Sequence, residues 1–431
     1  MKEIGGDIMK KAILVAVSLT NDESLVNYNL DELENLINTL DIECSYKVIQ
    51  KLSRPNQKTV VGPGKILEIN ELAKTLQVDY VIFDDELTPS QLKNIGEIIS
   101  SEIMDRSLII LDIFEKRAQT KQAKLEVKLA KYKYLAPRLR LLNQGLDRQG
   151  GGDKNSKGSG ETNVEIERRR IQTNVLNITA ELNKITKRKL QEVNKRKENK
   201  IPIVALVGYT NAGKSSTMNN IIKYTNDKAT DKLVFEKDQL FATLSTSNRR
   251  IVYDNTEFIL VDTVGFVNKL PHHLINSFKS TLEETKQADY IIQVVDANSP
   301  YVRTHIAITD SVIESLGASE IPEILLLNKQ DLITEGDGRL KTGKVEKLHS
   351  NKNEKDTKEL LDFIVEKIRE SSLDVSLLVP YTDGKMIALI DANEKVNSKL
   401  YVNDGVMYNI TVDPNNYYKY KKYDATKEKV S

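Results

Sequence analysis

This 431-residue sequence has one cysteine, no tryptophan and no long apolar run. Its one cysteine, Cys44, excludes an intramolecular disulfide and a zinc site built from several cysteines. No apolar run reaches the roughly 18 residues that a membrane helix needs, so we expect no membrane span. Ala12–Val17 is apolar and follows two lysines, but it is too short for a signal peptide and is expected to form a first β-strand. Together these absences favour a cytoplasmic protein.

Charge is nearly balanced overall but unevenly placed along the chain. The net charge is +1, yet residues 116–200 hold 23 Lys or Arg and 9 Asp or Glu, which gives them +14 and leaves −13 for the rest. A basic block within an acidic protein indicates a polyanionic partner such as nucleic acid. Basic runs also occur on ordinary solvated helices, so charge alone does not decide between the two interpretations.

A phosphate-binding pattern lies near the middle of the chain. Ile203–Val207 is a short apolar run rich in β-branched residues, and it predicts a buried strand. The predicted helix Ser216–Lys223 follows, so that its positive N-terminal end faces the same anion. Between them, eight residues fit G-x-x-x-x-G-K-[ST], a loop whose backbone amides surround phosphate, whose lysine reaches the β and γ oxygens and whose last hydroxyl ligates Mg²⁺. These residues are Gly208, Tyr209, Thr210, Asn211, Ala212, Gly213, Lys214 and Ser215.

Two further segments, in the order typical of a GTPase, predict contacts to the metal and the γ-phosphate. In the loop after the helix, Thr243 is placed to join Ser215 as a ligand of Mg²⁺. A predicted strand, Glu257–Val261, then ends in a D-x-x-G pattern, in which Asp262 holds the metal through water and the Gly265 amide touches the γ-phosphate. We assign catalytic roles to Lys214, Thr243 and Gly265. The candidate nucleotide contacts of the two segments are Phe241, Ala242, Thr243, Leu244 and Ser245, and Asp262, Thr263, Val264 and Gly265.

A third pattern predicts which nucleotide base the protein binds. The predicted strand Glu323–Leu327 ends in N-K-x-D, formed by Asn328, Lys329, Gln330 and Asp331. Asp331 accepts hydrogen bonds from guanine N1–H and N2–H, donors that adenine does not offer there, so GTP and GDP are favoured over adenine nucleotides by about 10⁴-fold. The fifth guanine-binding element is best matched by Ser350, Asn351 and Lys352, although the stretch Gly336–Lys358 is also compatible with a simple loop.

The N-terminal part predicts an α/β domain. Strands expected at Ala12–Val17, Ser45–Ile49, Tyr80–Phe83 and Leu108–Asp112 alternate with helices, which implies a mainly parallel sheet. The GPGK sequence at Gly62–Lys65 lacks the full phosphate-loop spacing and is interpreted as the turn that starts a helix.

Two apolar stripes at helical spacing, from Leu125 to Leu142 and from Ile171 to Ile185, predict a pair of long antiparallel helices bordered by Lys and Arg. Between them, residues 145–162 contain six glycines together with Arg148, Lys154 and Lys157. A long loop without core residues is usually functional or disordered, and we favour a loop that becomes ordered on RNA.

The C-terminal part predicts a small β-α-β-β unit over residues 374–412. It could be a small ferredoxin-like domain. Tyr417–Tyr423 interleaves Tyr and Lys, a composition that can stack on RNA, but we expect a disordered tail there.

The sequence resembles the HflX family. Its members are ribosome-associated GTPases of the translation-factor class and are related to the Obg group. The resemblance spans roughly residues 10–410. It rests on VIFDDELTPSQLKN (81–94), LDIFEKRAQT (111–120), KYLAPRL (133–139), DRQGGG (147–152) and GETNVEIERRRI (160–171), together with GYTNAGKS, LFATL and DTVGF. The family pattern usually reads GPGET where this chain has Gly158–Thr162, and S-A-K or S-A-L where it has Ser350–Lys352.

The resemblance implies an α/β fold: an N-terminal parallel α/β domain (1–115) with a long basic helical hairpin (116–200), a central P-loop GTPase domain (201–371), and a small α+β C-terminal domain with a tail (372–431). It implies a Mg²⁺-dependent, monomeric, cytoplasmic GTPase that binds the large ribosomal subunit and its rRNA and splits stalled ribosomes under heat stress. Two alternatives are a non-catalytic, nucleotide-gated assembly factor and an ATP-dependent RNA helicase acting through the N-terminal domain.

Overall fold

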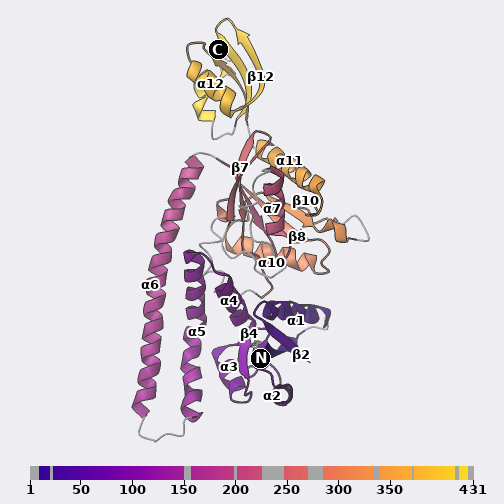
Figure 1. The fold of residues 1–431 in the computed structure, drawn as a ribbon, viewed down its shortest axis with the longest axis vertical. Helices are drawn as coiled ribbons and strands as arrows, with labels where there is room; N and C mark the ends of the chain where they lie inside the picture. Colours follow the sequence, from indigo (N-terminus) through magenta and orange to yellow (C-terminus); the bar gives the residue numbers. More distant parts are fainter. Residues whose placement is uncertain are drawn as a thin grey trace, which may run out of the picture.

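The fold is taken from a computed structural model, which describes residues 9–19, 23–149, 157–198, 201–225, 247–269, 285–333, 339–370, 373–412 and 417–425. Three sheets follow one another along the chain, and a long helical hairpin joins the first sheet to the second (Figure 1). The mixed α/β class with parallel sheets is confirmed.

The N-terminal sheet has the order β2-β1-β3-β4, and all of its neighbouring strands are parallel, as predicted. Alternate residues of β1 pack into two different cores, because helices cover both faces of this sheet. Its elements are β1 (Lys10–Ser18), α1 (Glu23–Asn38), β2 (Ile42–Lys51), α2 (Pro63–Leu76), β3 (Tyr80–Phe83), α3 (Pro89–Gly96) and β4 (Glu102–Asp105). Gly62 lies at the N-cap of α2, so GPGK starts a helix as interpreted.

One predicted strand of this domain is wrong. Leu108–Asp112 lies in helix α4 (Arg106–Arg117), and the fourth strand comes just before it. The Asp105 side chain caps the helix by accepting a 2.9 Å hydrogen bond from the Leu108 amide. The misassignment has a simple cause, since a short continuous apolar run fits a buried strand and a buried helix equally well.

The helical hairpin consists of α5 (Lys121–Gln149) and α6 (Lys157–Glu198), which lie side by side in Figure 1. Leu129, Ile178 and Leu182 are buried between the two helices, so the apolar stripes do hold the pair together. The predicted tip was too long, because both helices continue into residues 145–162. Residues 150–156, with Lys154, lie outside the described part of the chain.

The central sheet has six strands in the order β10-β9-β8-β5-β7-β6, with only β6 antiparallel to its neighbour. Since β5, β7, β8 and β9 are parallel, their carboxyl ends meet at one edge of the sheet. The elements are β5 (Ile203–Val207), α7 (Lys214–Thr225), β6 (Ser247–Tyr253), β7 (Thr256–Asp262), β8 (Tyr290–Asp296), α10 (Val302–Ser315), β9 (Glu323–Asn328), β10 (Val345–Leu348) and α11 (Glu354–Glu370).

The C-terminal unit is a three-stranded antiparallel sheet in the order β11-β13-β12 with one helix against it. Its elements are β11 (Leu373–Val379), α12 (Gly384–Asn393), β12 (Lys395–Val402) and β13 (Gly405–Val412), as the β-α-β-β pattern predicted. The expected disordered tail is wrong for residues 417–425. Tyr420 and Tyr423 are buried in the core of this unit, where their hydroxyls bond to Glu394 and Asp383, so this segment completes the domain.

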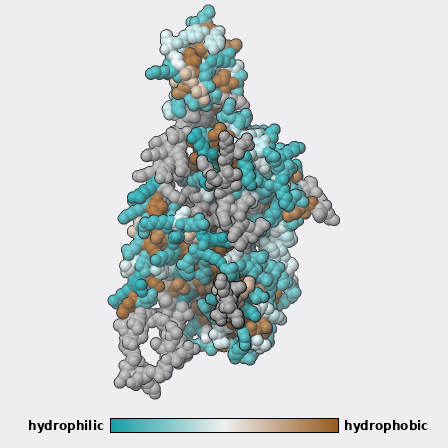
Figure 2. Space-filling model, viewed as in Figure 1, coloured by the Kyte–Doolittle hydropathy of each residue, from teal (hydrophilic) through white to brown (hydrophobic). Residues whose placement is uncertain are grey.

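Hydrophobic side chains are scattered in small patches on the face drawn in Figure 2. Within the residues that the structure describes, no helix combines the length and apolarity that crossing a bilayer requires.

Candidate nucleotide site

The phosphate loop joins the end of β5 to the start of α7, and its two outer glycines are required by their surroundings. Gly208 and Gly213 have φ angles of 142° and 100°, which side-chain-bearing residues rarely adopt. A Cβ added to Gly208 would lie 2.1 Å from the Val294 carbonyl oxygen, and one on Gly213 would lie 2.2 Å from Asn328 Nδ2. The motif therefore packs this loop directly against β8 and β9.

Lys214 is buried beneath the loop. Its ammonium group donates hydrogen bonds to the carbonyl oxygens of Gly208 (3.0 Å) and Tyr209 (2.8 Å). Burial lowers the pKa of Lys214 to about 8, while the charge of Asp262 acts in the opposite direction. An anion placed in the loop adds negative charge beside this lysine, so we expect a bound phosphate to hold it in the ammonium form.

Two hard oxygen donors meet at the start of α7. Ser215 Oγ donates a 2.7 Å hydrogen bond to Asp262 Oδ2, at the end of β7. A hydroxyl and a carboxylate fit Mg²⁺, which keeps most of its waters and takes few protein ligands beside the nucleotide's phosphates. The described residues contain no group of three or more His, Cys, Asp or Glu able to hold a metal by themselves. The second predicted ligand, Thr243, lies outside the described residues with Phe241, Ala242, Leu244 and Ser245.

The N-K-x-D segment and residues 350–352 meet at the carboxyl ends of β9 and β10. Asn328 Nδ2 donates to the Ala212 carbonyl oxygen (2.8 Å), which ties β9 to the phosphate loop. Asp331 accepts from Ser350 Oγ at 2.7 Å and pairs with Lys352 Nζ at 2.8 Å. The bond from Lys352, with help from Ser350, holds the pKa of Asp331 below its usual range, so this carboxylate is ionised as guanine recognition requires.

The two remaining members of the N-K-x-D segment lie beside these residues. Lys329 pairs with Asp296 at 2.7 Å, and Gln330 starts a short 3-10 turn, Gln330–Leu332. The structure thus brings all four residues of this pattern to the same edge of the sheet.

The D-x-x-G segment folds back onto the phosphate loop. The Thr263 hydroxyl donates to the Leu206 carbonyl (2.7 Å), and Val264 is buried. The Thr210 amide donates to the Phe266 carbonyl (2.7 Å), and the Phe266 amide donates to the Gly208 carbonyl (3.1 Å). A Cβ on Gly265 would lie 3.0 Å from Lys214 Nζ, so this glycine allows the close approach.

The Phe266 side chain occupies the position after D-x-x-G and is only 2% exposed. Its ring belongs to an apolar core with Val207, Val264 and Val267. No hydrogen-bonding side chain therefore comes from this position toward the phosphates.

A buried polar network links the phosphate loop to the N-terminal domain, and the sequence patterns did not reveal it. Tyr209 donates its hydroxyl hydrogen to Glu32 Oε1 of α1 at 2.5 Å, and the same hydroxyl oxygen accepts from the Asn268 amide at 2.6 Å. Arg106 bridges Glu32 (2.5 Å) and Asp84 (2.9 Å) and is 1% exposed. One signal was available, since Arg106 stands at the edge of a strongly apolar run.

Lys269, just after the D-x-x-G segment, extends this network to the end of β3. Its ammonium group pairs with Asp84 and, at 2.6 Å, with Asp85. Strand order in the N-terminal sheet reverses between β1 and β3, the point at which open α/β sheets usually bind ligands. Here that point carries carboxylates and receives a lysine of the same chain, an arrangement that disfavours a phosphate-bearing ligand there.

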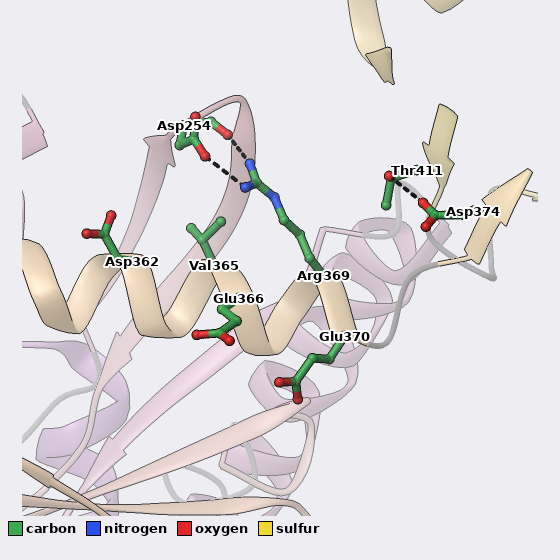
Figure 3. A pocket seen from close by; sticks show the side chains of 8 residues that line it. All are labelled: Asp254, Asp362, Val365, Glu366, Arg369, Glu370, Asp374 and Thr411. Atoms are coloured by element: carbon green, nitrogen blue, oxygen red, sulfur yellow. Dashed lines mark hydrogen bonds and ion pairs between the residues drawn. The ribbon is translucent and has the colours of Figure 1, made fainter. Parts of the chain in front are cut away.

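A cavity of about 480 Å³ lies elsewhere, between α11 and the C-terminal unit (Figure 3). Arg369 of α11 reaches across it to the β6–β7 turn and pairs with Asp254 at 2.8 Å. Asp374 and Thr411, joined by a 2.6 Å hydrogen bond, close the opposite side. None of the residues that line it belongs to the nucleotide patterns.

Three family models match successive parts of this chain. They are described as GTP-binding GTPase N-terminal (residues 27–115), GTP-binding GTPase Middle Region (117–196) and 50S ribosome-binding GTPase (203–329). A GTPase HflX from Caldanaerobacter subterraneus is 37% identical over 94% of this chain and 91% of its own length. The GTPase HflX of Escherichia coli is 38% identical over 78% of this chain and 76% of its own. Among solved structures, a GTP-binding protein from Sulfolobus solfataricus in complex with GDP has a TM-score of 0.41 at 22% identity, over 83% of this chain and 98% of that one.

Proposed function

Because this chain belongs to the HflX family of GTPases, we propose that it binds GTP and GDP at the edge of the central sheet described above and hydrolyses GTP there with Mg²⁺. Lys214 contacts the β and γ phosphates, Ser215 ligates the metal, and Asp262 supports it. Thr243 would be the second protein ligand of the metal, and the Gly265 amide would bind the γ-phosphate. Mg²⁺ supplies charge neutralisation at the phosphates when bound.

Guanine specificity in this proposal comes from Asn328 and Asp331. Asn328 holds the phosphate loop, and the Asp331 carboxylate accepts the guanine N1–H and N2–H hydrogens after Lys352 moves aside. Lys352 is well suited to such a movement, since its side chain is 75% exposed. Ser350 keeps the carboxylate in place throughout.

The observation that supports this function best is the meeting of three separate patterns at one sheet edge. Ser215 Oγ lies 2.7 Å from Asp262, Asn328 Nδ2 lies 2.8 Å from the Ala212 carbonyl, and Ser350 Oγ lies 2.7 Å from Asp331. These contacts join segments separated by 47, 116 and 19 residues. A non-catalytic assembly factor would need the same nucleotide contacts, so hydrolysis is the property that separates the two.

We further propose that the partner is the large ribosomal subunit and its rRNA, and that the protein acts in the cytoplasm as a monomer to split stalled ribosomes under stress. The description of the matched central model, 50S ribosome-binding GTPase, and the +14 charge of residues 116–200 support this partner. Bound GTP favours the ribosome complex, and hydrolysis releases it.

Hydrolysis by the isolated protein should be slow. In Ras-like enzymes a glutamine after D-x-x-G orients the attacking water, whereas Phe266 offers no conventional hydrogen bond and is buried. Turnover on the order of 10⁻³ s⁻¹ or below is expected from positioning and charge alone. The large subunit should accelerate it by supplying the missing polar contact.

The test is phosphate release from GTP with and without purified large subunits, under single-turnover and steady-state conditions. Stimulation by the subunit supports the proposal. Fast turnover that subunits leave unchanged would contradict partner activation, and the absence of hydrolysis in both conditions would favour the non-catalytic assembly factor.

A further inference from the structure

The loop between β10 and α11 presents two neighbouring side chains in opposite directions. Ser350 points to Asp331, toward the candidate guanine position. Asn351 points to the phosphate loop, where its Nδ2 donates to the Gly213 carbonyl oxygen at 3.2 Å. The loop therefore contacts both the base-reading side and the phosphate-binding side of the site.

Asn351 also binds the first helix of the phosphate-binding unit. Its Oδ1 lies 3.1 Å from the hydroxyl of Thr217, a fully buried residue of α7 whose one hydroxyl hydrogen is shared between this oxygen and the Gly213 carbonyl oxygen at 2.9 Å. Its main-chain oxygen accepts from Asn220 Nδ2 at 2.6 Å, and His349 Nε2 lies 3.0 Å from the same Oδ1. One side chain thus joins the loop, the phosphate loop and α7.

The two amides that face the phosphate loop act on consecutive carbonyl groups. Asn328, from the N-K-x-D segment, holds the carbonyl of Ala212, and Asn351 holds that of Gly213. A Cβ at Gly213 would lie 2.2 Å from the first amide nitrogen and 2.9 Å from the second. The two base-reading segments are therefore bonded to neighbouring residues of the phosphate loop, Asn328 to Ala212 and Asn351 to Gly213.

A cavity of about 280 Å³ lies beside the loop, lined by Asn220, Tyr224 and Thr357 among others. Other hydrogen bonds hold the loop on its far side, where the His349 amide donates to the Leu327 carbonyl oxygen (2.9 Å) and the Ser350 amide donates to Asp356 (2.8 Å). The bonds of Asn351 tie the loop to the phosphate loop and to α7.

We propose that Asn351 is a positioning residue that couples guanine recognition to the phosphate loop and slows the release of bound GDP. This inference rests on the proposed assignment of residues 350–352 to the guanine site. When nucleotide leaves, the base-reading loop must move, and the Asn351 bonds oppose that movement. Losing the side-chain bonds of Asn351 should therefore accelerate GDP release about tenfold.

The experiment measures dissociation of a fluorescent GDP from the full-length protein, chased with excess GDP. Asn351→Ala removes the side-chain bonds, and alanine is the residue that guanine-binding loops usually carry here, so folding should be retained. We expect about tenfold faster release of GDP from this variant than from the wild-type protein. Asn353→Ser, in the same loop, is the matched control, because serine keeps the bond that Asn353 Oδ1 accepts from the Lys355 amide.

Thr217→Val supplies a second variant, since it keeps the side chain's shape and removes the hydroxyl that faces both Asn351 Oδ1 and the Gly213 carbonyl oxygen. It should accelerate release by a smaller factor, and adding it to Asn351→Ala should give less than the product of the two factors because they share one bond. Unchanged release in both single variants, or equal acceleration by Asn353→Ser, would overturn the proposal. Failure of the wild-type protein to bind GDP would instead refute the proposed function on which it rests.

Discussion

Tyr209 of the phosphate loop donates a 2.5 Å hydrogen bond to Glu32, which lies 177 residues earlier in the N-terminal domain. The ring of the same tyrosine stacks on His305 of α10, with 3.9 Å between centroids. His305 in turn lies 2.6 Å from the hydroxyl of Tyr28, again in the N-terminal domain. The phosphate loop is therefore part of the interface between the two domains. A movement of Tyr209 would change its hydrogen bond to Glu32 of α1.

Replacing Tyr209 by Phe tests this interface in the nucleotide-free protein. The change removes a donor to Glu32 and an acceptor of the Asn268 amide, both in a buried site, and should cost about 1–3 kcal/mol. The midpoint of thermal unfolding should fall by several degrees. Tyr253→Phe is the matched control, because its hydroxyl bonds to Asp362 at the exposed surface and its loss should cost less than about 0.5 kcal/mol. Equal shifts of the thermal midpoint in the two variants would show that the buried Tyr209 contact stabilises the protein no more than an exposed one.

His305 should make this interface sensitive to acid. Burial lowers the pKa of His305 to about 4 from an ordinary value of 6.5. The unfolded chain therefore takes up this proton at a higher pH than the folded chain, and stability falls as the pH drops from about 7 toward 4, by about 1 kcal/mol at pH 5.5. Thermal midpoints at pH 7.5 and 5.5 should differ more in the wild type than in His305→Gln, which cannot titrate. The same fall in both proteins would assign the acid sensitivity to other groups.

Asp331→Asn should change the choice of base. The amide presents a donor where guanine N1–H and N2–H also donate, so GTP affinity should fall by several kcal/mol, while xanthine nucleotides should bind better. Calorimetric titration with GTP and XTP measures both effects, with Asp362→Asn on α11 as a control that leaves the site intact. An unchanged GTP affinity would remove Asp331 from guanine recognition.

The basic hairpin predicts a steep salt dependence for binding to the large subunit. Contacts between Lys or Arg and rRNA phosphates release counterions, so the logarithm of the affinity should fall linearly with the logarithm of salt. Neutralising Arg148, Lys154 and Lys157 should reduce that slope by about 2 and leave GTP binding intact. Sedimentation at several salt concentrations measures the slope, and Lys74, Lys355 and Lys358 offer a control set outside the hairpin. A complex insensitive to salt would favour a merely solvated basic surface.

The sequence predicted the local patterns of the nucleotide site but not the long-range contacts between the domains. The strands that carry the GTPase patterns were predictable, because each motif follows an apolar run and parallel strands bring their carboxyl ends together. Helix α4 was mistaken for a strand, since the run over Leu108–Asp112 has no periodicity that separates the two. The contacts of Glu32 with Arg106 and Tyr209 span 74 and 177 residues, and no short pattern encodes them.

The C-terminal tyrosines show a different limit of sequence reasoning. Tyr417–Tyr423 interleaves Tyr with Lys, so its composition suggests solvent exposure, yet Tyr420 and Tyr423 fill the core of the small domain. The Tyr420 hydroxyl donates to Glu394 and the Tyr423 hydroxyl donates to Asp383. These hydrogen bonds allow the two polar side chains to be buried.

Helix α6 has a mechanical consequence. It contains 42 residues, so it is about 63 Å long, and it ends at Glu198, five positions before the strand β5 that leads into the phosphate loop. A lever of that length magnifies small rotations: a tilt of about 5° at the β5 end displaces the opposite end by about 5 Å, close to one helical turn. Angular changes of a few degrees at Glu198 thus become displacements of several ångströms at Lys157, the other end of α6.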